Sequence, residues 1–146
     1  MPGIIAKEFS ELSLDELYSL IQCRQEVFVT EQHCFYQDLD GLDRHSIHLI
    51  VADGNGVVGY LRVIRPGFHG ENAVIGRVAV RKDSRSNGIG RMMMKRGIEI
   101  ARTLSQAIDI EAQAYLKAFY ESLGFKALSE PYIHADTPHI HMRLTF

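Results

Sequence analysis

Residues 85–101, RSNGIGRMMMKRGIEIA, place two glycines and an arginine directly before a run with the periodicity of an α-helix. Glycine is a poor helix residue and costs about 1 kcal/mol relative to alanine in a helix interior. A helix N-terminus, however, exposes up to four unpaired backbone N–H groups at the positive end of the helix dipole. Because glycines let a ligand approach those groups closely, the stretch predicts a phosphate-binding turn ahead of a helix over 88–105. A tight strand-to-helix turn with ordinary capping is the alternative.

Two common nucleotide motifs do not fit this turn. A P-loop has Lys-Ser or Lys-Thr after its second glycine, where this chain has Arg91 and Met92. A dinucleotide fingerprint requires a third glycine, and Met93 occupies that position. Another phosphate-bearing ligand is therefore expected, with Arg85 and Arg91 adding positive charge. The backbone N–H groups that would hold it belong to Ser86, Asn87, Gly88, Ile89, Gly90 and Arg91.

The segments around this turn predict one domain over residues 1–146, of mixed α/β (α+β) class. Strands are expected at 3–9, 46–53, 57–64, 73–81, 107–113, 125–130 and 139–146. Ser13 and Glu16 have capping-box spacing before an N-terminal helix. Its buried side is expected to carry Leu14, Leu17, Tyr18 and Ile21, with Val27 and Phe28 as further candidates. A short helix is expected at 115–123. The order β-α-β-β-β-α-β-α-β-β combines hairpins with one βαβ crossover, which predicts a mixed sheet covered by helices.

Composition excludes several classes of protein. The chain has 146 residues, 46% of them hydrophobic and 23% charged, which is enough for a core without metals or disulfides. Its net charge of −2 argues against binding to nucleic acid or an anionic membrane. No signal-peptide pattern or run of about 20 apolar residues is visible. Two cysteines are too few for a disulfide framework, so a reducing cytoplasm is expected.

Two motifs together resemble the signature of the GCN5-related N-acetyltransferases (GNAT). The family's cofactor motif, Arg/Gln-x-x-Gly-x-Gly/Ala between a strand and a helix, is matched by RSNGIG at 85–90. The family's next strand and helix commonly end in N-x-x-A-x-x-x-Y-x-x-x-G-F, and residues 113–125 read QAYLKAFYESLGF, with Gln113 and Leu116 as departures. Residues 17–43, His48 and residues 130–142 resemble the ElaA-like branch of the superfamily, so the resemblance covers nearly the whole chain.

The resemblance implies a mostly antiparallel sheet of about six to seven strands flanked by about four helices. It also implies acetyl-CoA as co-substrate, in a V-shaped gap between the strand before the turn and the strand after the helix. Backbone groups of Val78 and Val80, with Ala79 between them, would pair with pantetheine amides, and Gln113 would contact the same arm. Tyr120 would protonate the departing thiolate, because a phenol of pKa near 10 can supply a proton to a thiolate of pKa about 8.5. A structural aromatic is the alternative for Tyr120.

The attacking amine must lose a proton, because a lysine-like amine of pKa near 10.4 is neutral in only about one molecule per thousand at pH 7. A side chain or a relayed water has to accept it. His139 suits a base near neutrality, and Glu111 lies in the strand beside the gap. Glu31 and His141 are further candidates. Surface or structural roles are open for all four, and the base remains unassigned.

The acidic segment from residue 31 to residue 43 has two interpretations. Glu31, Asp38, Asp40 and Asp43 form a negative rim that attracts a cationic amine, or a solvated loop whose aspartates cap turns. A calcium loop is excluded, because leucine occupies the fifth position of DLDGLD. The candidates for shaping the acceptor pocket are Arg24, Gln25, Glu31 and Arg77.

No metal is expected. His45 and His48, like His139 and His141, could each supply two ligands, but neither pair has further cysteine or carboxylate ligands at suitable spacing. The function expected from these features is N-acetyl transfer from acetyl-CoA to a primary amine by direct attack, although Cys34 is available as a covalent carrier. A non-catalytic acyl-CoA sensor is the alternative. An exposed C-terminal edge strand would allow homodimer pairing.

Overall fold

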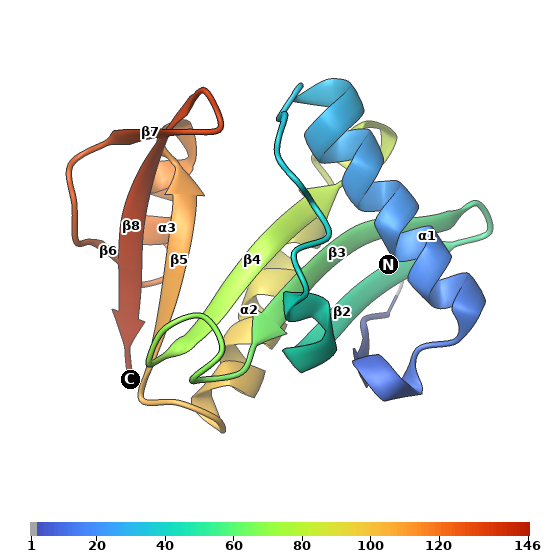
Figure 1. Ribbon diagram of the computed structural model, residues 1–146, viewed down its shortest axis with the longest axis horizontal. Helices are drawn as coiled ribbons and strands as arrows, with labels where there is room; N and C mark the ends of the chain where they lie inside the picture. The colour runs from blue at the N-terminus through green and yellow to red at the C-terminus, as the bar shows by residue number, and fades with distance from the viewer. Residues whose placement is uncertain (1–2) are drawn as a thin grey trace.

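A computed structural model describes residues 3–146, in which an eight-stranded sheet carries helices on both faces (Figure 1). The strands are β1 (Ile5–Glu8), β2 (Ser46–Asp53), β3 (Gly56–Ile64), β4 (Ala73–Val80), β5 (Ala107–Gln113), β6 (Lys126–Ala127), β7 (Tyr132–His134) and β8 (Thr137–Thr145). The α-helices are α1 (Leu14–Arg24), α2 (Ile89–Arg102) and α3 (Lys117–Glu121), and a π-helical segment, η2 (Gln25–Glu31), continues α1. Short 3₁₀ turns are η1 (Phe9–Glu11), η3 (Leu42–His45), η4 (Lys82–Ser84) and η5 (Ala114–Leu116).

The sheet is antiparallel except at its centre. Its order is β1-β2-β3-β4-β5-β8-β6, with β7 also paired to β8. The parallel pair β4–β5 is joined only where Ala73 faces Ile108 and Val74 faces Asp109. Beyond that point the two strands diverge, and the sheet is divided into two halves (Figure 1). The predicted class, a mixed and mostly antiparallel sheet with one βαβ crossover, is confirmed.

The C-terminal strand is not an edge strand, contrary to expectation. β8 pairs with β5 along one side and with β6 and β7 along the other. The β7–β8 hairpin, which was not expected, turns at Ala135 and Asp136, both of which have positive φ. Because β8 has no unpaired side over most of its length, it gives no basis for dimer pairing.

Helices α1 and α2 pack on opposite faces of the sheet. α2 buries Ile89, Met93 and Gly97, as its periodicity predicts. The predicted face of α1 is confirmed at Leu17 and Ile21, which pack against a core that includes Val27 and Phe28. It is wrong at Leu14 and Tyr18, which are 86% and 74% exposed. The helix instead buries a stripe offset by about one residue against β3 and β4. That stripe comprises Leu20, Cys23 and Arg24, with Val27 and Phe28 following on η2.

A bulge in β4 changes which of its side chains face α2. Arg77 has φ +52°, and the register with β3 shifts between Tyr60 and Arg62. One extra residue reverses the alternation, so Val74, Gly76, Val78 and Val80, which a regular strand would place on one face, do not share a face. Ile75, Val78 and Val80 pack with the core under α2, while Ala79 packs with the core under α1. No helix within residues 3–146 is long and apolar enough to cross a bilayer.

Candidate active site

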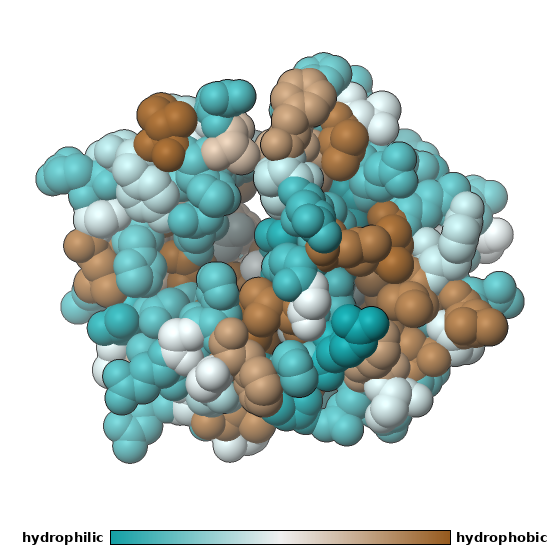
Figure 2. Space-filling model, in the orientation of Figure 1, coloured by the Kyte–Doolittle hydropathy of each residue, from teal (hydrophilic) through white to brown (hydrophobic). Residues whose placement is uncertain are grey.

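A cleft of about 650 Å³ lies where β4 and β5 diverge. Val78 and Val80 line one wall, and Ile110 and Gln113 line the other. The end of η2 and the loop after it form part of the lining, as do η5, α3 and the β7–β8 turn. Figure 2 shows a hollow between the two halves of the molecule. The diverging strands therefore expose backbone and side chains from both halves of the sheet to one cavity.

The glycine turn leads from the end of β4 into α2. Gly88 has φ +76°, which a β-carbon would strain, and no atom lies within 4 Å of where that carbon would stand. Within residues 3–146, none of the backbone N–H groups of residues 86–91 donates to a protein acceptor. The first helical bond runs from Met92 N–H to the Gly88 carbonyl, at 3.0 Å. The turn thus presents the open N–H groups that an anion site needs.

The arginine that begins the motif is held by contacts to the protein. Arg85 donates from Nε to the Val80 carbonyl at 2.9 Å and from Nη2 to Glu31 Oε1 at 2.7 Å. This hydrogen bond lowers the pKa of Glu31. Arg91 donates to Ser122 Oγ at 2.9 Å. The Arg85–Glu31 pair joins the end of η2 to the turn at one end of the cleft.

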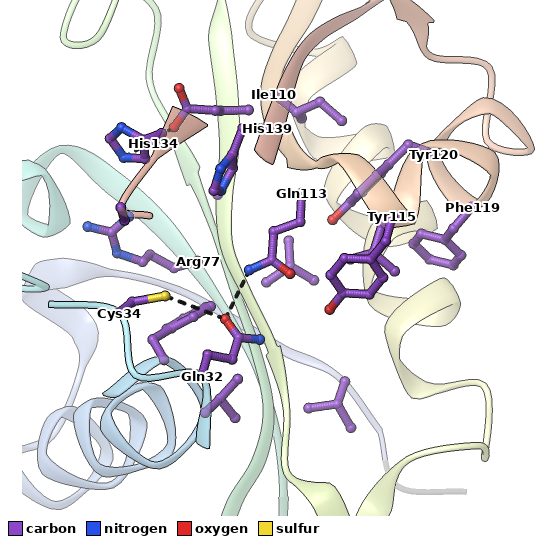
Figure 3. A pocket seen from close by; sticks show the side chains of 18 of the residues that line it. Gln32, Cys34, Arg77, Ile110, Gln113, Tyr115, Phe119, Tyr120, His134 and His139 are labelled. Atoms are coloured by element: carbon purple, nitrogen blue, oxygen red, sulfur yellow. Dashed lines mark hydrogen bonds and ion pairs between the residues drawn. The ribbon is translucent and has the colours of Figure 1, made fainter. Parts of the chain in front are cut away.

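Tyr120 projects from α3 into the cleft, and its hydroxyl and that of Tyr115 point toward the cavity in Figure 3. Its ring makes edge contacts with Phe119 and Phe125, at centroid distances of 5.1 and 6.1 Å. Burial raises the pKa of Tyr120 to about 12. The phenol is therefore protonated at neutral pH and can act as a proton donor in the cavity.

Two of the candidate bases line the cavity from β5 and β8, with different surroundings. His139 is 8% exposed, and its Nδ1 lies 2.7 Å from the Thr137 carbonyl. Since a carbonyl only accepts, Nδ1 carries the proton and a neutral ring keeps the lone pair on Nε2. Glu111 is engaged, because Oε2 accepts from the Tyr132 hydroxyl at 2.6 Å and Oε1 lies 3.5 Å from His134 Nε2.

A hydrogen bond crosses the cleft between its two walls. Gln113 on β5 donates from Nε2 to Gln32 Oε1 at 3.0 Å. Cys34 Sγ lies 3.8 Å from the same oxygen, as the dashed lines of Figure 3 show. Burial raises the pKa of the Cys34 thiol. Gln113 thus links β5 to the N-terminal segment.

The family model described as the acetyltransferase (GNAT) domain matches residues 6–146. The chain belongs to the GNAT acetyltransferase family. Protein ElaA of Escherichia coli is 37% identical over 137 residues, covering 91% of this chain and 90% of that protein, which places the chain in the ElaA-like branch.

Solved structures agree with this membership of the GNAT family. An acyl-CoA N-acyltransferase from Pseudomonas aeruginosa has a TM-score of 0.93 and 39% identity, covering 99% of this chain and all of that one. The crystal structure of Escherichia coli ElaA has a TM-score of 0.92 and 36% identity, covering 99% of each chain. Members of the GNAT family bind acyl-CoA.

The residues expected to shape the acceptor pocket of this GNAT chain do not all reach the cavity. Arg77 and Glu31 line it. Arg24 is fully buried elsewhere, with Nε 3.0 Å from Asp38 and Nη1 2.8 Å from Asp43. Gln25 is exposed on η2, outside the cleft lining. Arg24 is therefore a structural residue that fixes the loop forming one wall of the cavity.

Neither expectation describes the acidic segment as a whole. Asp38, Asp40 and Asp43 are paired with arginines, so they do not form a free negative rim. The turn-capping role is confirmed for Asp40, whose Oδ1 also accepts from Leu42 N–H at 3.0 Å. The other members of this ion-pair network are Arg24, Arg62 and Arg77. Asp43 lies at its centre and accepts from Arg24 and Arg62 through one oxygen. No group of three or more metal-ligating side chains occurs within residues 3–146.

The network makes the fold sensitive to acid. Burial opposes the ionisation of Asp40 and Asp43, but hydrogen bonds and charge from Arg62 and Arg24 lower both pKa values. Burial lowers the pKa of His48, which lies between the Tyr60 hydroxyl and the Asp43 carbonyl. The folded chain therefore resists protonation at sites that the unfolded chain protonates freely.

We expect the free energy of unfolding to fall as the pH drops below about 6.5, where His48 of the unfolded chain begins to take up a proton. It should fall more steeply below about 4, where the unfolded aspartates are protonated first. Urea unfolding between pH 7 and pH 3.5 measures this. Stability that stays constant over this range would contradict the assigned pairing.

Proposed function

We propose that this protein transfers the acetyl group of acetyl-CoA to a primary amine by direct attack in a ternary complex. The observation that carries the proposal is the row of open N–H groups at residues 86–91, beside a cleft that also holds Tyr120 and His139. Open amides at a helix N-terminus suit a diphosphate. A buried phenol and an imidazole in the same cavity suit acyl transfer.

The divergence of β4 and β5 provides a binding surface for acetyl-CoA. Past Val74, β4 has no hydrogen-bonded partner on its β5 side. The backbone groups of residues 78–80 on that side, apart from the Val80 carbonyl that already accepts from Arg85 Nε, can pair with the amides of the pantetheine arm, as an added strand would. In this proposal the diphosphate of acetyl-CoA binds the N–H groups of residues 86–91, and the thioester lies between Gln113 and Tyr120.

The proposed reaction requires that the attacking amine loses one proton and that the departing thiolate gains one. The amine nitrogen attacks the thioester carbonyl, a C–N bond forms and the C–S bond breaks. His139 Nε2 accepts the proton that leaves the amine, directly or through water, and Tyr120 donates its proton to the departing thiolate. The tyrosinate regains a proton from solvent, so acetylated amine and free CoA are the products.

Cys34→Ser should keep most of its turnover. Because burial raises the pKa of this thiol, little thiolate is present to carry an acetyl group. Steady-state thiol release by the variant and by the wild type measures this. Loss of turnover in a folded variant, with an acetylated wild-type protein detected by mass spectrometry, would replace direct attack with a covalent route.

Calorimetry with acetyl-CoA, together with thiol release in the presence of amines and peptides, tests the activity itself. We expect binding of acetyl-CoA and thiol release that depends on the acceptor. Binding without acceptor-dependent release, across a wide panel of amines and peptides, would instead indicate a non-catalytic acyl-CoA sensor.

A further inference from the structure

The cleft continues past the proposed thioester position into a space that we call the acceptor chamber. Its lining residues are Phe28, Cys34, Tyr36, Arg77, His134 and His139. From this chamber we propose that the acceptor is a monoamine with an apolar, preferentially aromatic body, and not a polyamine or other polycation. This inference rests on the proposed function, because it describes the second substrate of that reaction.

The first argument is the balance of charge along the cavity. Its two carboxylates, Glu31 and Glu111, are engaged by Arg85 and by Tyr132 with His134. Within residues 3–146, every carboxylate that lines the cavity has a hydrogen-bond or ion-pair partner in the protein. Of the two, only Glu111 lacks an arginine partner, and its oxygens are engaged by Tyr132 and His134. A second ammonium group would have to displace those contacts to find a counter-ion, and burying it unpaired is strongly unfavourable.

The cation of Arg77 is balanced as well. Its Nε lies 2.8 Å from Asp38 Oδ1, and its Nη2 lies 3.3 Å from Asp40 Oδ2. Arg77 therefore has no free charge with which to bind a carboxylate group of the acceptor. The described lining therefore has no unpaired cation that could bind a second charged group of the acceptor. Contact with the acceptor's carbon atoms is then the main source of its affinity.

The second argument is the aromatic wall of the chamber. Tyr36 and His134 have ring centroids 6.3 Å apart, and His134 and His139 pack edge to face at 5.3 Å. The Arg77 guanidinium lies 5.0 Å over the Tyr36 ring. The rings of Tyr36, after η2, His134, on β7, and His139, on β8, thus adjoin one another along one wall, which suits a flat apolar group.

Two exposed apolar side chains, which are not themselves part of the cavity lining, stand next to lining residues on the two sides of the chamber, at a place that we call its mouth. Phe35, next to Tyr36, is 84% exposed, and Ile133, next to His134, is 69% exposed. Apolar side chains stand on both sides of the hollow in Figure 2, over β7 and over the segment that follows α1. Large exposed apolar groups beside a cavity mark a ligand-binding surface.

A chamber without surplus negative charge also helps the chemistry. Removing an ammonium from water disfavours its charged form and lowers the pKa of the amine. More of the bound acceptor is then the neutral nucleophile. A carboxylate that paired with the ammonium would have the opposite effect, and the two in the described lining, Glu31 and Glu111, already accept from Arg85 and from Tyr132.

The test compares 2-phenylethylamine, butylamine and spermidine as acceptors with acetyl-CoA. We expect kcat/KM to be highest for 2-phenylethylamine and to exceed that of spermidine by about tenfold or more, since burial of a few carbon atoms gives discrimination of this size. Spermidine equal to or better than 2-phenylethylamine would overturn this inference and leave the proposed function standing. Absence of thiol release with every amine, while acetyl-CoA still binds, would overturn both.

Two variants separate the chamber from the reaction centre. Phe35→Ser and Ile133→Ser should raise the KM for 2-phenylethylamine while kcat and the affinity for acetyl-CoA stay near wild-type values. Leu14→Ser, at a side chain as exposed as Phe35 but on α1 with no lining residue next to it in the sequence, is the matched control and should change neither constant. An unchanged KM in both chamber variants would show that the mouth does not contact the acceptor and would contradict the proposal.

Discussion

Replacing Tyr120 with phenylalanine should lower kcat by about 100-fold or more, the usual contribution of a positioned general acid. The affinity for acetyl-CoA should stay near the wild-type value, because the ring and its edge contacts with Phe119 and Phe125 remain. Burial keeps the phenol protonated, so it can give its proton to the leaving thiolate at neutral pH. Pre-steady-state and steady-state thiol release measure the change.

Tyr115→Phe is the matched control. Tyr115 also lines the cavity, but it is 73% exposed, so solvent replaces its hydroxyl readily. Its kcat should therefore change much less. Unchanged turnover in Tyr120→Phe would assign the donated proton to water or another group.

Asp43→Ala should lower the free energy of unfolding by about 3–5 kcal/mol, because it leaves a buried positive charge uncompensated. Asp43 Oδ1 accepts from Arg24 Nη1 at 2.8 Å and from Arg62 Nη1 at 3.0 Å. The Arg24 side chain is fully buried, and that of Arg62 is 3% exposed. Urea unfolding with an unchanged m-value measures the effect.

The control is Glu99→Ala, which removes one partner of the exposed Arg96–Glu99 pair on α2. Surface pairs contribute about 0–1 kcal/mol, so this variant should stay close to the wild type. Equal losses in the two variants would mean that the ion-pair network contributes no more to stability than a surface contact does.

Local signals in the sequence predicted local structure well. The capping box is confirmed, because Ser13 Oγ accepts from Glu16 N–H and the Glu16 carboxylate accepts from Ser13 N–H. The glycine turn and α2 also follow from neighbouring residues, since helix periodicity and a positive φ at Gly88 are encoded within a few positions. These features needed no knowledge of the tertiary fold.

Features that depend on distant residues were missed. Asp40 meets Arg62 and Arg77, which lie 22 and 37 residues along the chain, so its charge looked free in the sequence. The bulge in β4 has its positive φ at Arg77 and not at the neighbouring Gly76, so the strand pattern did not reveal it. For the same reason the base remained open: only the structure shows that Glu111 is held by Tyr132, while His139 presents Nε2.

The most direct test of the diphosphate site is an NMR titration of the ¹⁵N-labelled protein with acetyl-CoA, followed at each backbone amide. We expect the largest shift changes and slowed hydrogen exchange at residues 86–91, with smaller changes at residues 78–80. Binding that leaves the amides of residues 86–91 unperturbed, with the shift changes at other residues, would contradict the phosphate-binding turn. It would also contradict the proposed transferase site, which depends on that turn.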